Sequence, residues 1–499
     1  MNIRTLTAII IYTVLTAMVA SAQENTATAT EGIQQKIENI VNGDVLRDAV
    51  VGVCARMGNG QTLVDINAGD LLVPASNMKL ISTGAALHAL GGDYRYRTAL
   101  AYDGSIVDGV LLGDLYIIGG GDPTIASKDS IAAPVEHTFA LWERLIRDAG
   151  INEVDGRVIG TSGDFFTGMA EEPSWMWSDI GTYYGAGVTG LMFFENVQSF
   201  NVSAGTEVGA PVKISPSYPV APWMEFRYDC STGKAGTGDQ LYMYTSDLSP
   251  VAEVRGTFAV DRKPKRVDCS NKFPELTCAH YFSEWLADHG ITCSKEAADT
   301  KLHGVAEPDS LVIIGHTSSP SLRRIAFETN HASNNLYAET LLKTLGKELR
   351  NEGCYDSSYV AVKNVLKDLG VDTSRGIRIQ DGSGLSRQNF VSPDFFCRYL
   401  EAMMGQECFE DFAESLPSPG GTGTLASNMK NYPAETRARI KAKSGSMNGV
   451  RCYSGYIIPT EGCKDDTIVF SIMVNNSTQP TWKVRPLLDK IMGLLAETN

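Results

Sequence analysis

Apolar residues in the first part of the chain follow two different periods, and each period predicts a different element. They recur every three or four positions over residues 31–42, which predicts an amphipathic helix. The apolar runs 49–57 and 61–67 flank a glycine-rich turn, which predicts a β-hairpin. A largely apolar stretch after Pro74 then predicts a buried helix that ends at the glycine pair 91–92.

The pattern changes over residues 92–320. Short β-like runs are divided there by Gly, Pro and Asp, with a few helical stretches such as 139–150 among them. This pattern of short strands predicts one or two mainly β modules inserted between two parts of another domain.

Long helical patterns return in the rest of the chain. Both 325–349 and 358–370 are amphipathic at helical spacing. Strands are then predicted at 445–459 and 467–476, and a closing helix at 482–497.

A hairpin at the front and strands at the back, with helices between them, predict one antiparallel sheet assembled from both ends of the chain and covered by helices. The predicted fold class is therefore α/β, of the α+β kind. Its sheet domain is divided between residues 23–91 and 321–499 by the mainly β region 92–320.

The first 22 residues have the pattern of a signal peptide. Arg4 precedes an apolar stretch, and the small-x-small triplet Ala20-Ser21-Ala22 follows it, so the mature chain is expected to start at Gln23. No other stretch reaches the roughly 18 apolar residues that a membrane span needs. The pattern predicts an exported protein, periplasmic or extracellular, that is soluble or peripherally attached to the cell envelope.

Composition narrows the class of protein. The chain has 499 residues, of which 43% are hydrophobic and 20% charged, as in a soluble globular protein of two or three domains. The formal net charge is −15, and the one dense basic run, 262–266, is too short to bind a phosphate backbone. Nucleic acid is excluded as a partner on these grounds.

Cysteine and histidine spacing offers no metal site. The ten cysteines form no paired C-x-x-C motif, and the seven histidines form no H-E-x-x-H motif, so neither a metal nor a cofactor is predicted. An even number of cysteines in an exported chain favours disulfides, although connectivity cannot be deduced from sequence. The candidate bridges join near neighbours: Cys397 with Cys408, Cys452 with Cys463, and Cys278 with Cys293.

The motif S-x-x-K, which pairs a nucleophilic serine with a lysine, begins at Ser76, Ser231 and Ser427. For such a pair to react, the serine must lie at a helix start and the lysine one turn later on the same face. Ser76 satisfies this requirement because an apolar helix follows it. Ser231 lies in a glycine-rich stretch that predicts a loop, and Pro433 limits any helix after Ser427 to about one turn.

Two further motifs supply the rest of an acylating site. Ser333-Asn334-Asn335 lies at a kink between two helical patterns and offers a hydroxyl and an amide. Lys443-Ser444-Gly445 lies directly before a predicted strand, where a cation and a hydroxyl could receive a carboxylate. The order S-x-x-K, S-x-N, K-S-G is that of β-lactamases and penicillin-binding proteins.

With these motifs the chain resembles the low-molecular-mass class C penicillin-binding proteins, the D-alanyl-D-alanine carboxypeptidase/endopeptidase group of the penicillin-binding protein 4 type. The resemblance covers nearly the whole mature chain and includes GGGDPT at 119–124, WMWSDIGTYYGAG at 175–187 and DGSGLSRQNFVSP at 381–393. The separation of Ser76 and Ser333 also matches the inserted domains of this family. The resemblance implies a serine β-lactamase/transpeptidase-like domain with an insertion.

The resemblance implies a role for each motif residue. Ser76 would be the nucleophile and Lys79 its general base, although the base is disputed for related enzymes. Ser333 would pass the proton to the departing D-Ala amine, and Asn335 would hold the substrate's amide. Asn334 stands where Asp is common, and this departure is expected to matter little.

Further positions would bind the substrate. Lys443 and Ser444 would receive the terminal carboxylate, with Ser444 keeping the hydroxyl of the commoner Thr. The backbone N–H groups of Ser76 and Ser446 would form the oxyanion hole. Asp179, in the inserted region, resembles the acid that meets the amino group of the substrate's diamino acid.

The function implied is a serine-type D-Ala-D-Ala carboxypeptidase acting on peptidoglycan stem peptides, with a further DD-endopeptidase activity on cross-links. β-Lactam antibiotics would acylate the same serine. Two alternatives stay open on sequence alone: a β-lactamase or esterase on the same scaffold, and a penicillin-binding protein that does not hydrolyse its substrate. The oligomeric state, including a homodimer, is also open.

Overall fold

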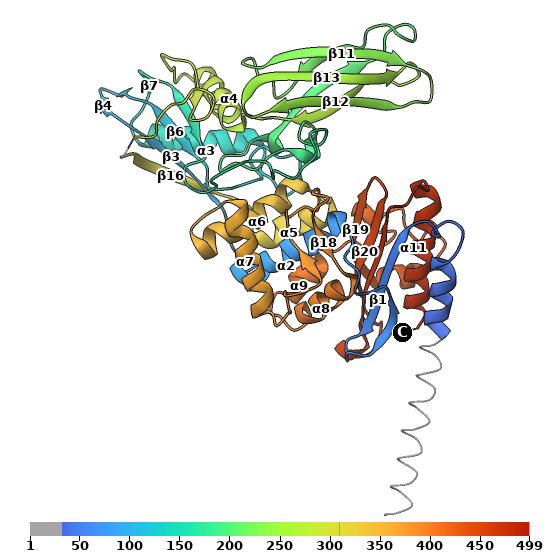
Figure 1. Cartoon of the computed structure of the whole chain (residues 1–499). Helices are drawn as coiled ribbons and strands as arrows, with labels where there is room; N and C mark the ends of the chain where they lie inside the picture. Colours follow the sequence, from blue (N-terminus) through green and yellow to red (C-terminus); the bar gives the residue numbers. More distant parts are fainter. Residues whose placement is uncertain (1–31, 309, 499) are drawn as a thin grey trace, which may run out of the picture.

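A computed structural model of the chain describes residues 32–308 and 310–498 (Figure 1). The predicted signal peptide 1–22 and the start at Gln23 lie outside the described residues. In the part that is described, no helix combines the length and the apolar character needed to cross a membrane.

An antiparallel sheet built from both ends of the chain has the strand order β19-β20-β21-β1-β2. Blue β1 lies beside the red C-terminal strands in Figure 1. β1 pairs with β21 from Val50 opposite Asn475 to Met57 opposite Ile468. The predicted antiparallel sheet from both chain ends, and with it the fold class, is confirmed. The strands are β1 (Val50–Met57), β2 (Thr62–Ile66), β19 (Ile440–Met447), β20 (Val450–Ile457) and β21 (Ile468–Asn475).

Both faces of this sheet are covered, which explains why β21 is buried along its whole length. Successive strand residues point to opposite faces, so Val469 and Met473 enter one apolar cluster while Phe470 and Ile472 enter another. Helix α8 (Pro393–Met403) packs on the first face. The second cluster is shared with the predicted N-terminal helix, observed at 32–41, and with the closing helix α11 (Thr481–Ala496).

The helices on the α8 side carry the residues that the motifs singled out. The short turn of helix η1 (Ala75–Asn77) leads directly into α2, which ends at Gly91 as predicted. The two long helical patterns are also confirmed, the first as a pair of helices with a break at residues 332–334. These helices are α2 (Met78–Leu90), α5 (Leu322–His331), α6 (Asn335–Arg350), α7 (Tyr355–Asp368) and α9 (Phe409–Glu414).

The region between α2 and α5 forms further sheets, of strand orders β15-β8-β6-β3-β16, β4-β5-β7, β10-β9-β14 and β11-β13-β12. They lie above α5 and α6 in Figure 1. The chain leaves and returns at one point, because Ser319 N donates to Tyr96 O over 3.0 Å and Tyr96 N donates to Ser319 Oγ over 3.0 Å. The predicted limits of this region, 92 and 320, stay a prediction.

The elements of this region are β3 (Arg97–Tyr102), β4 (Ser105–Val107), β5 (Val110–Leu112), β6 (Leu115–Ile118), α3 (Val135–Asp148), β7 (Glu153–Val154), β8 (Val158–Thr161), η2 (Tyr183–Gly185), η3 (Phe194–Asn196), β9 (Val197–Ser203), β10 (Lys213–Ser217), β11 (Glu225–Gly233), β12 (Asp239–Ser246), β13 (Ser249–Ala259), β14 (Lys265–Ser270), α4 (Pro274–Asp288), β15 (Ala298–Asp299) and β16 (Val312–Ser318). Short elements in the last part of the chain are β17 (Ile377–Arg378), β18 (Phe390–Val391), η4 (Gly423–Leu425), α10 (Ala434–Ala438) and η5 (Lys464–Asp466). The helix predicted at 139–150 corresponds to α3.

Two predicted placements are wrong. Ser231 lies in strand β11 and not in a loop, because its polar, glycine-containing sequence belongs to a strand at the edge of its sheet. The single strand predicted at 445–459 is a hairpin of β19 and β20 that turns at Asn448 and Gly449. Lys443 therefore lies within β19 and not before a strand.

The predicted disulfides are not formed. All ten cysteines lie within the described residues, and each is a free thiol. Cys397 Sγ instead contacts Cys54 O at 3.5 Å, and Cys452 Sγ contacts Val73 O at 3.7 Å, so these thiols are used in packing.

Candidate active site

The serine of the first motif lies at the junction of η1 and α2. Lys79 follows one helical turn after Ser76 and is fully buried, and its Nζ lies 3.0 Å from Ser76 Oγ. Ala75, directly before the serine, has φ 46°, a strained conformation for a residue with a Cβ. Gly384, at φ 84°, packs so close to Ala75 O that a Cβ would overlap it. The serine is therefore presented on a tight, locally strained turn.

The amine of Lys79 faces three oxygen atoms. Besides Ser76 Oγ, these are Asn335 Oδ1 at 2.6 Å and Ser383 O at 2.8 Å. Burial lowers the pKa of Lys79 to about 7, while nearby Glu339 and then Asp381 act in the opposite direction. A neutral amine has two N–H bonds and one lone pair. If the two acceptors take the N–H bonds, the lone pair points at Ser76 Oγ.

The second and third motifs meet at another buried lysine. Lys443 Nζ donates to Ser333 Oγ and to Ser444 O, both at 2.9 Å. Burial and then the charge of Lys79 lower the pKa of Lys443 well below its usual range. Ser333 has φ 60° in the break between α5 and α6, the predicted kink. Ser444 Oγ donates to Thr424 Oγ1 over 3.0 Å.

Strand β19 is the edge of its sheet and lies against the turn that carries the serine. In the described part of the chain no strand pairs with its outer edge. A Cβ on Gly445 would come within 2.5 Å of Pro74 O, so only glycine permits this approach. A peptide could therefore add to the open edge of β19 beside Ser76.

A cavity of about 790 Å³ opens between this strand, the motif residues and the inserted region. Its lining includes five of the predicted residues: Ser76, Ser333, Asn335, Ser446 and Asp179. Lys79, Lys443 and Ser444 do not line the cavity. Lys79 contacts Ser76 and Lys443 contacts Ser333, both of which line it, and Ser444 directly follows Lys443. The structure thus brings the eight predicted residues to one site.

Asp179 reaches the cavity from the inserted region. Tyr184 Oη donates to Asp179 Oδ1 over 3.3 Å. Burial raises the pKa of Asp179, while the Tyr184 hydroxyl and Arg387 oppose the shift. Asp179 is therefore a half-buried acid in the wall of the cavity.

Residues of the inserted region also accept hydrogen bonds from the two asparagines of the second motif. Asn335 Nδ2 donates to Tyr184 O over 2.8 Å, and Asn334 Nδ2 donates to Glu195 Oε2 over 3.0 Å. Asn334 also caps α6 by accepting from Tyr337 N over 3.1 Å. The middle residue of the motif has a structural function in this chain.

The sequence predicts a turn at 382–386, but it did not indicate that this turn contacts Lys79. Glu339 accepts N–H bonds from Gly382 and Ser383, which fixes the Ser383 carbonyl against Lys79. Asp381 accepts from Gly384 N over 2.7 Å and from other groups of the same turn. Burial and Asp381 raise the pKa of Glu339 above its usual range. Glu339 follows the second motif by four residues and Asp381 begins the segment DGSGLSRQNFVSP, but nothing in their spacing indicates this contact.

The other S-x-x-K matches lack these surroundings. Ser427 and Lys430 are exposed, and Ser427 Oγ accepts a hydrogen bond from Arg485 over 2.9 Å. Ser231 lies on β11, away from the residues that line the cavity. In the described part of the chain, no group of three or more His, Cys, Asp or Glu side chains could hold a metal ion.

A serine hydroxyl beside a buried amine of lowered pKa, next to an open strand edge, is the arrangement of enzymes that acylate a serine. A family model described as the D-Ala-D-Ala carboxypeptidase 3 (S13) family matches residues 33–494. The chain therefore belongs to this family of D-Ala-D-Ala carboxypeptidases, and it is an enzyme.

Relatives match over most of their length. A D-alanyl-D-alanine carboxypeptidase of Actinomadura sp. (strain R39) is 30% identical over 482 residues, which are 94% of this chain and 85% of the relative. D-alanyl-D-alanine carboxypeptidase DacB of Haemophilus influenzae is 24% identical over 419 residues, 83% of each chain.

A solved structure confirms the fold. The crystal structure of penicillin-binding protein 4 from Haemophilus influenzae superposes with a TM-score of 0.78 at 20% identity and covers 93% of this chain and 98% of that one. The same protein has been crystallised in complex with a β-lactam, and that structure superposes with a TM-score of 0.72.

Proposed function

We propose that this chain removes the terminal D-Ala from peptidoglycan stem peptides, with Ser76 as the nucleophile. The observation that carries the proposal is the contact of 3.0 Å between Ser76 Oγ and the buried amine of Lys79. A neutral amine at this distance can accept the hydroxyl proton in the step that forms the acyl-enzyme.

In the first step Ser76 Oγ attacks the carbonyl carbon of the penultimate D-Ala while Lys79 takes its proton. The negative charge that develops on the carbonyl oxygen is stabilised by the N–H groups of Ser76 and Ser446. Ser446 lines the cavity near the end of β19, which supports this assignment.

The leaving amine then needs a proton. Ser333 donates its hydroxyl proton to the D-Ala nitrogen and is reprotonated from the ammonium of Lys79, so Lys79 is neutral again before deacylation. The hydrogen bond from Lys443 Nζ to Ser333 Oγ supports the placement of this hydroxyl. Lys443 and Ser444 bind the terminal carboxylate of the substrate, and Asn335 holds the amide on the other side of the scissile bond. Departure of D-Ala leaves Ser76 as an ester.

Water completes the cycle. Lys79 accepts a proton from a water molecule, whose oxygen attacks the ester carbonyl, and Ser76 Oγ regains its proton as the bond to the carbonyl carbon breaks. The shortened peptide leaves with a new carboxylate. A β-lactam acylates Ser76 in the same way, but its leaving group stays tethered and the ester persists.

Asp179 gives the site a preference for a substrate side chain that carries an amino group. We place its carboxylate against the amino group of the substrate's diamino acid. The cavity of about 790 Å³ also leaves room for a second peptide in place of the terminal D-Ala, which supports a DD-endopeptidase activity on cross-links. A substrate of this kind lies in the cell envelope, so the proposal includes export to the periplasm or the cell exterior.

Labelling with a fluorescent penicillin tests the nucleophile. We expect Ser76→Ala to abolish the covalent label and Ser427→Ala, which alters the exposed copy of the same tetrapeptide, to label like wild type. Label that survives in Ser76→Ala would contradict the assignment.

Product analysis tests the reaction. Wild-type protein should release D-Ala from a pentapeptide muropeptide, and Ser76→Ala should release none. Rapid turnover of penicillin would favour the β-lactamase alternative, and stable labelling without any release of D-Ala would favour a non-hydrolytic penicillin-binding protein.

A further inference from the structure

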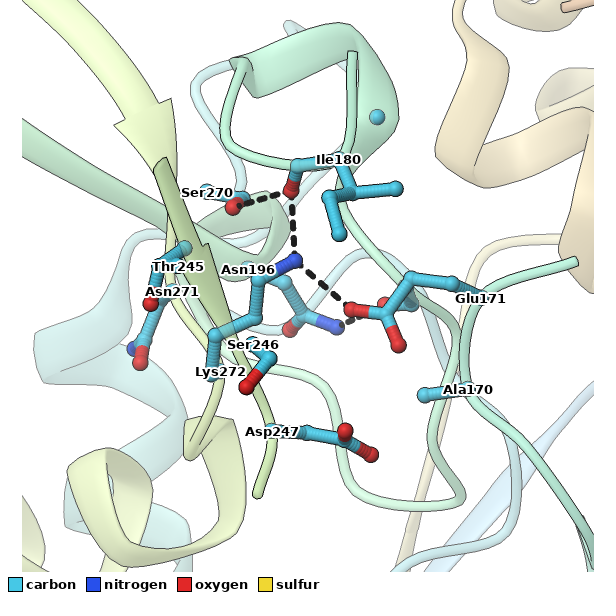
Figure 2. A network of polar contacts seen from close by, with 12 residues as sticks. Ala170, Glu171, Ile180, Asn196, Thr245, Ser246, Asp247, Ser270, Asn271 and Lys272 are labelled. Atoms are coloured by element: carbon cyan, nitrogen blue, oxygen red, sulfur yellow. Dashed lines mark hydrogen bonds and ion pairs between the residues drawn. The ribbon is translucent and has the colours of Figure 1, made fainter. Parts of the chain in front are cut away.

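A buried lysine outside the reacting cluster, Lys272, connects the two ends of the segment that carries Asp179. Lys272 lies between β14 and α4, and its side chain is 1% exposed. Its Nζ contacts Glu171 Oε1 at 2.6 Å and Ile180 O at 2.5 Å. Figure 2 shows this ammonium between the two oxygen atoms.

These contacts join both ends of the segment 171–180. Ile180 directly follows Asp179, so the ammonium fixes the backbone at the residue next to the cavity carboxylate. Ser270 supports the same point, because its Oγ donates to Ile180 O over 2.7 Å and its N–H donates to Gly181 O over 3.0 Å.

The first half of the segment 171–180 is attached separately, by hydrogen bonds to the turn at 381–386. Trp175 Nε1 donates to Asp381 Oδ2 over 2.9 Å, and the hydroxyls of Ser174 and Ser386 lie 2.5 Å apart. The second half, which contains Asp179, lacks these attachments. Two backbone hydrogen bonds to Met176 O, from Asp179 N over 2.8 Å and from Ile180 N over 3.3 Å, close the turn at Asp179. Lys272 connects this turn to Glu171 at the start of the segment.

The physical requirements of the ion pair favour a positioning role. A buried ammonium is costly to desolvate, and an apolar side chain of similar volume often stabilises a fold as well as a buried ion pair does. The Ile180 carbonyl already has Ser270 as a donor. What Lys272 adds is a charge-assisted link of fixed geometry between Glu171 and Ile180.

We propose that Lys272 is a positioning residue that sets the preference of the site for acyl donors with a free amino group, because it holds Asp179 in place in the cavity. The inference rests on the proposed function, in which Asp179 meets that amino group. Lys272 itself does not line the cavity and touches no substrate.

A pair of peptides measures this preference. Nα-acetyl-L-Lys-D-Ala-D-Ala keeps the free ε-amine, whereas Nα,Nε-diacetyl-L-Lys-D-Ala-D-Ala does not, and the ratio of their kcat/KM values is the selectivity. We expect Asp179→Asn to reduce this ratio to near one and Lys272→Met to reduce it at least fivefold. Acylation by benzylpenicillin, which has no amino group, should change less than threefold in Lys272→Met.

Matched variants distinguish a loss of the positioning of Asp179 from a general loss of activity or stability. Lys265→Met removes the ion pair between Lys265, at the start of β14, and Asp239 of β12, neither of which lines the cavity, and it should keep the wild-type ratio. Lys272→Arg keeps a charge and should recover part of the ratio. Ser270→Ala removes the other donor to Ile180 O and should lower the ratio in the same direction by a smaller factor.

The experiment distinguishes a failure of the role proposed for Lys272 from a failure of the role proposed for Asp179. An unchanged ratio in Lys272→Met, or an equal loss of benzylpenicillin acylation, would overturn the role of Lys272. If Lys272→Met does not fold, an unchanged ratio in Ser270→Ala would overturn it. An unchanged ratio in Asp179→Asn would instead refute the role of Asp179 in the proposed function.

Discussion

At the scale of single residues, the site depends on how two lysines are buried near each other. Lys443 has its pKa lowered by burial and by the charge of Lys79, so two ammonium groups in this space disfavour one another. Lys79 faces Asn335 Oδ1 and Ser383 O as well as the serine. Burial favours the neutral amine of Lys79, and the two acceptors then take its N–H bonds and leave the lone pair facing Ser76.

The pH dependence of acylation tests this view of Lys79. Burial lowers the pKa of Lys79 to about 7, so its basic, neutral form predominates above that pH. The rate constant for acylation by penicillin should therefore rise about tenfold per pH unit below 7 and level off above it. Stopped-flow measurement between pH 5.5 and 9 checks this profile.

Lys79→Arg provides the comparison, because an arginine stays protonated throughout this range. We expect it to lower the rate by about 10²-fold or more, the typical effect of losing a general base, and to remove the inflection. A wild-type rate that is flat or falling between pH 6 and 8 would show that another group accepts the proton.

Sequence motifs predicted the side chains that the fold brings to the cavity, but they did not indicate the Ser383 carbonyl that faces Lys79. Ser76, Ser333 and Lys443 stand in motifs whose spacing carries chemical information. The Ser383 carbonyl leaves no such trace, because every residue has a carbonyl, and only the folded turn brings this one to Lys79. Lys272 was equally hidden, since a single lysine gives no indication that it will be buried.

At the scale of elements, the position of the serine depends on the close packing of α2 against α8. Gly84 in α2 is buried, and an added Cβ would overlap Tyr399 Oη from α8. That hydroxyl donates to Leu80 O of α2 over 3.0 Å. The glycine therefore permits a backbone approach that an alanine would prevent.

We expect Gly84→Ala to lower the free energy of unfolding by about 1–3 kcal/mol, the usual cost of overpacking a core, and to slow labelling by penicillin. The midpoint of urea unfolding measures the first effect. Gly69→Ala is the matched control, since nothing lies within 4 Å of the added Cβ there. Equal midpoints for Gly84→Ala and wild type would refute this account of the packing.

Elements with a regular apolar period were predictable, and elements that serve the site or an edge were not. The hairpin β1–β2, α3 and α11 all agree with their patterns. In β19 the charged residue Lys443 occupies a buried position because the site uses it, which disturbs the alternation. In β11 most residues are exposed or half-buried, so its polar sequence resembles a loop.

At the scale of the whole molecule, apolar packing connects the inserted region to the helices. Phe166, Val188 and Met192 belong to the same buried cluster as Leu341 and Leu345 of α6. The sequence pattern predicted an inserted, mainly β region but could not predict this interface, because its residues are far apart along the chain. The active-site cavity lies across the same boundary.

The state of the cysteines gives a prediction for the whole chain. All ten are free thiols, so a reducing agent should leave the thermal midpoint unchanged. Protein unfolded in guanidinium without reductant should react with ten equivalents of Ellman's reagent. In the native state the reaction should be slower, because burial raises the pKa of thiols such as Cys452. Fewer than ten thiols in the unfolded protein would show that a bridge forms.

The pairing of β1 with β21 has a consequence for how the protein is made. Because β21 lies between β1 and β20, the sheet behind Ser76 cannot close until residues 468–475 have left the ribosome. Contacts of such large sequence separation also form late in folding. A nascent or prematurely terminated chain thus carries the nucleophile without the β19 edge that guides a substrate to it. We therefore expect reactivity toward cell-wall peptides and antibiotics only after β21 has been synthesised and has paired with β1.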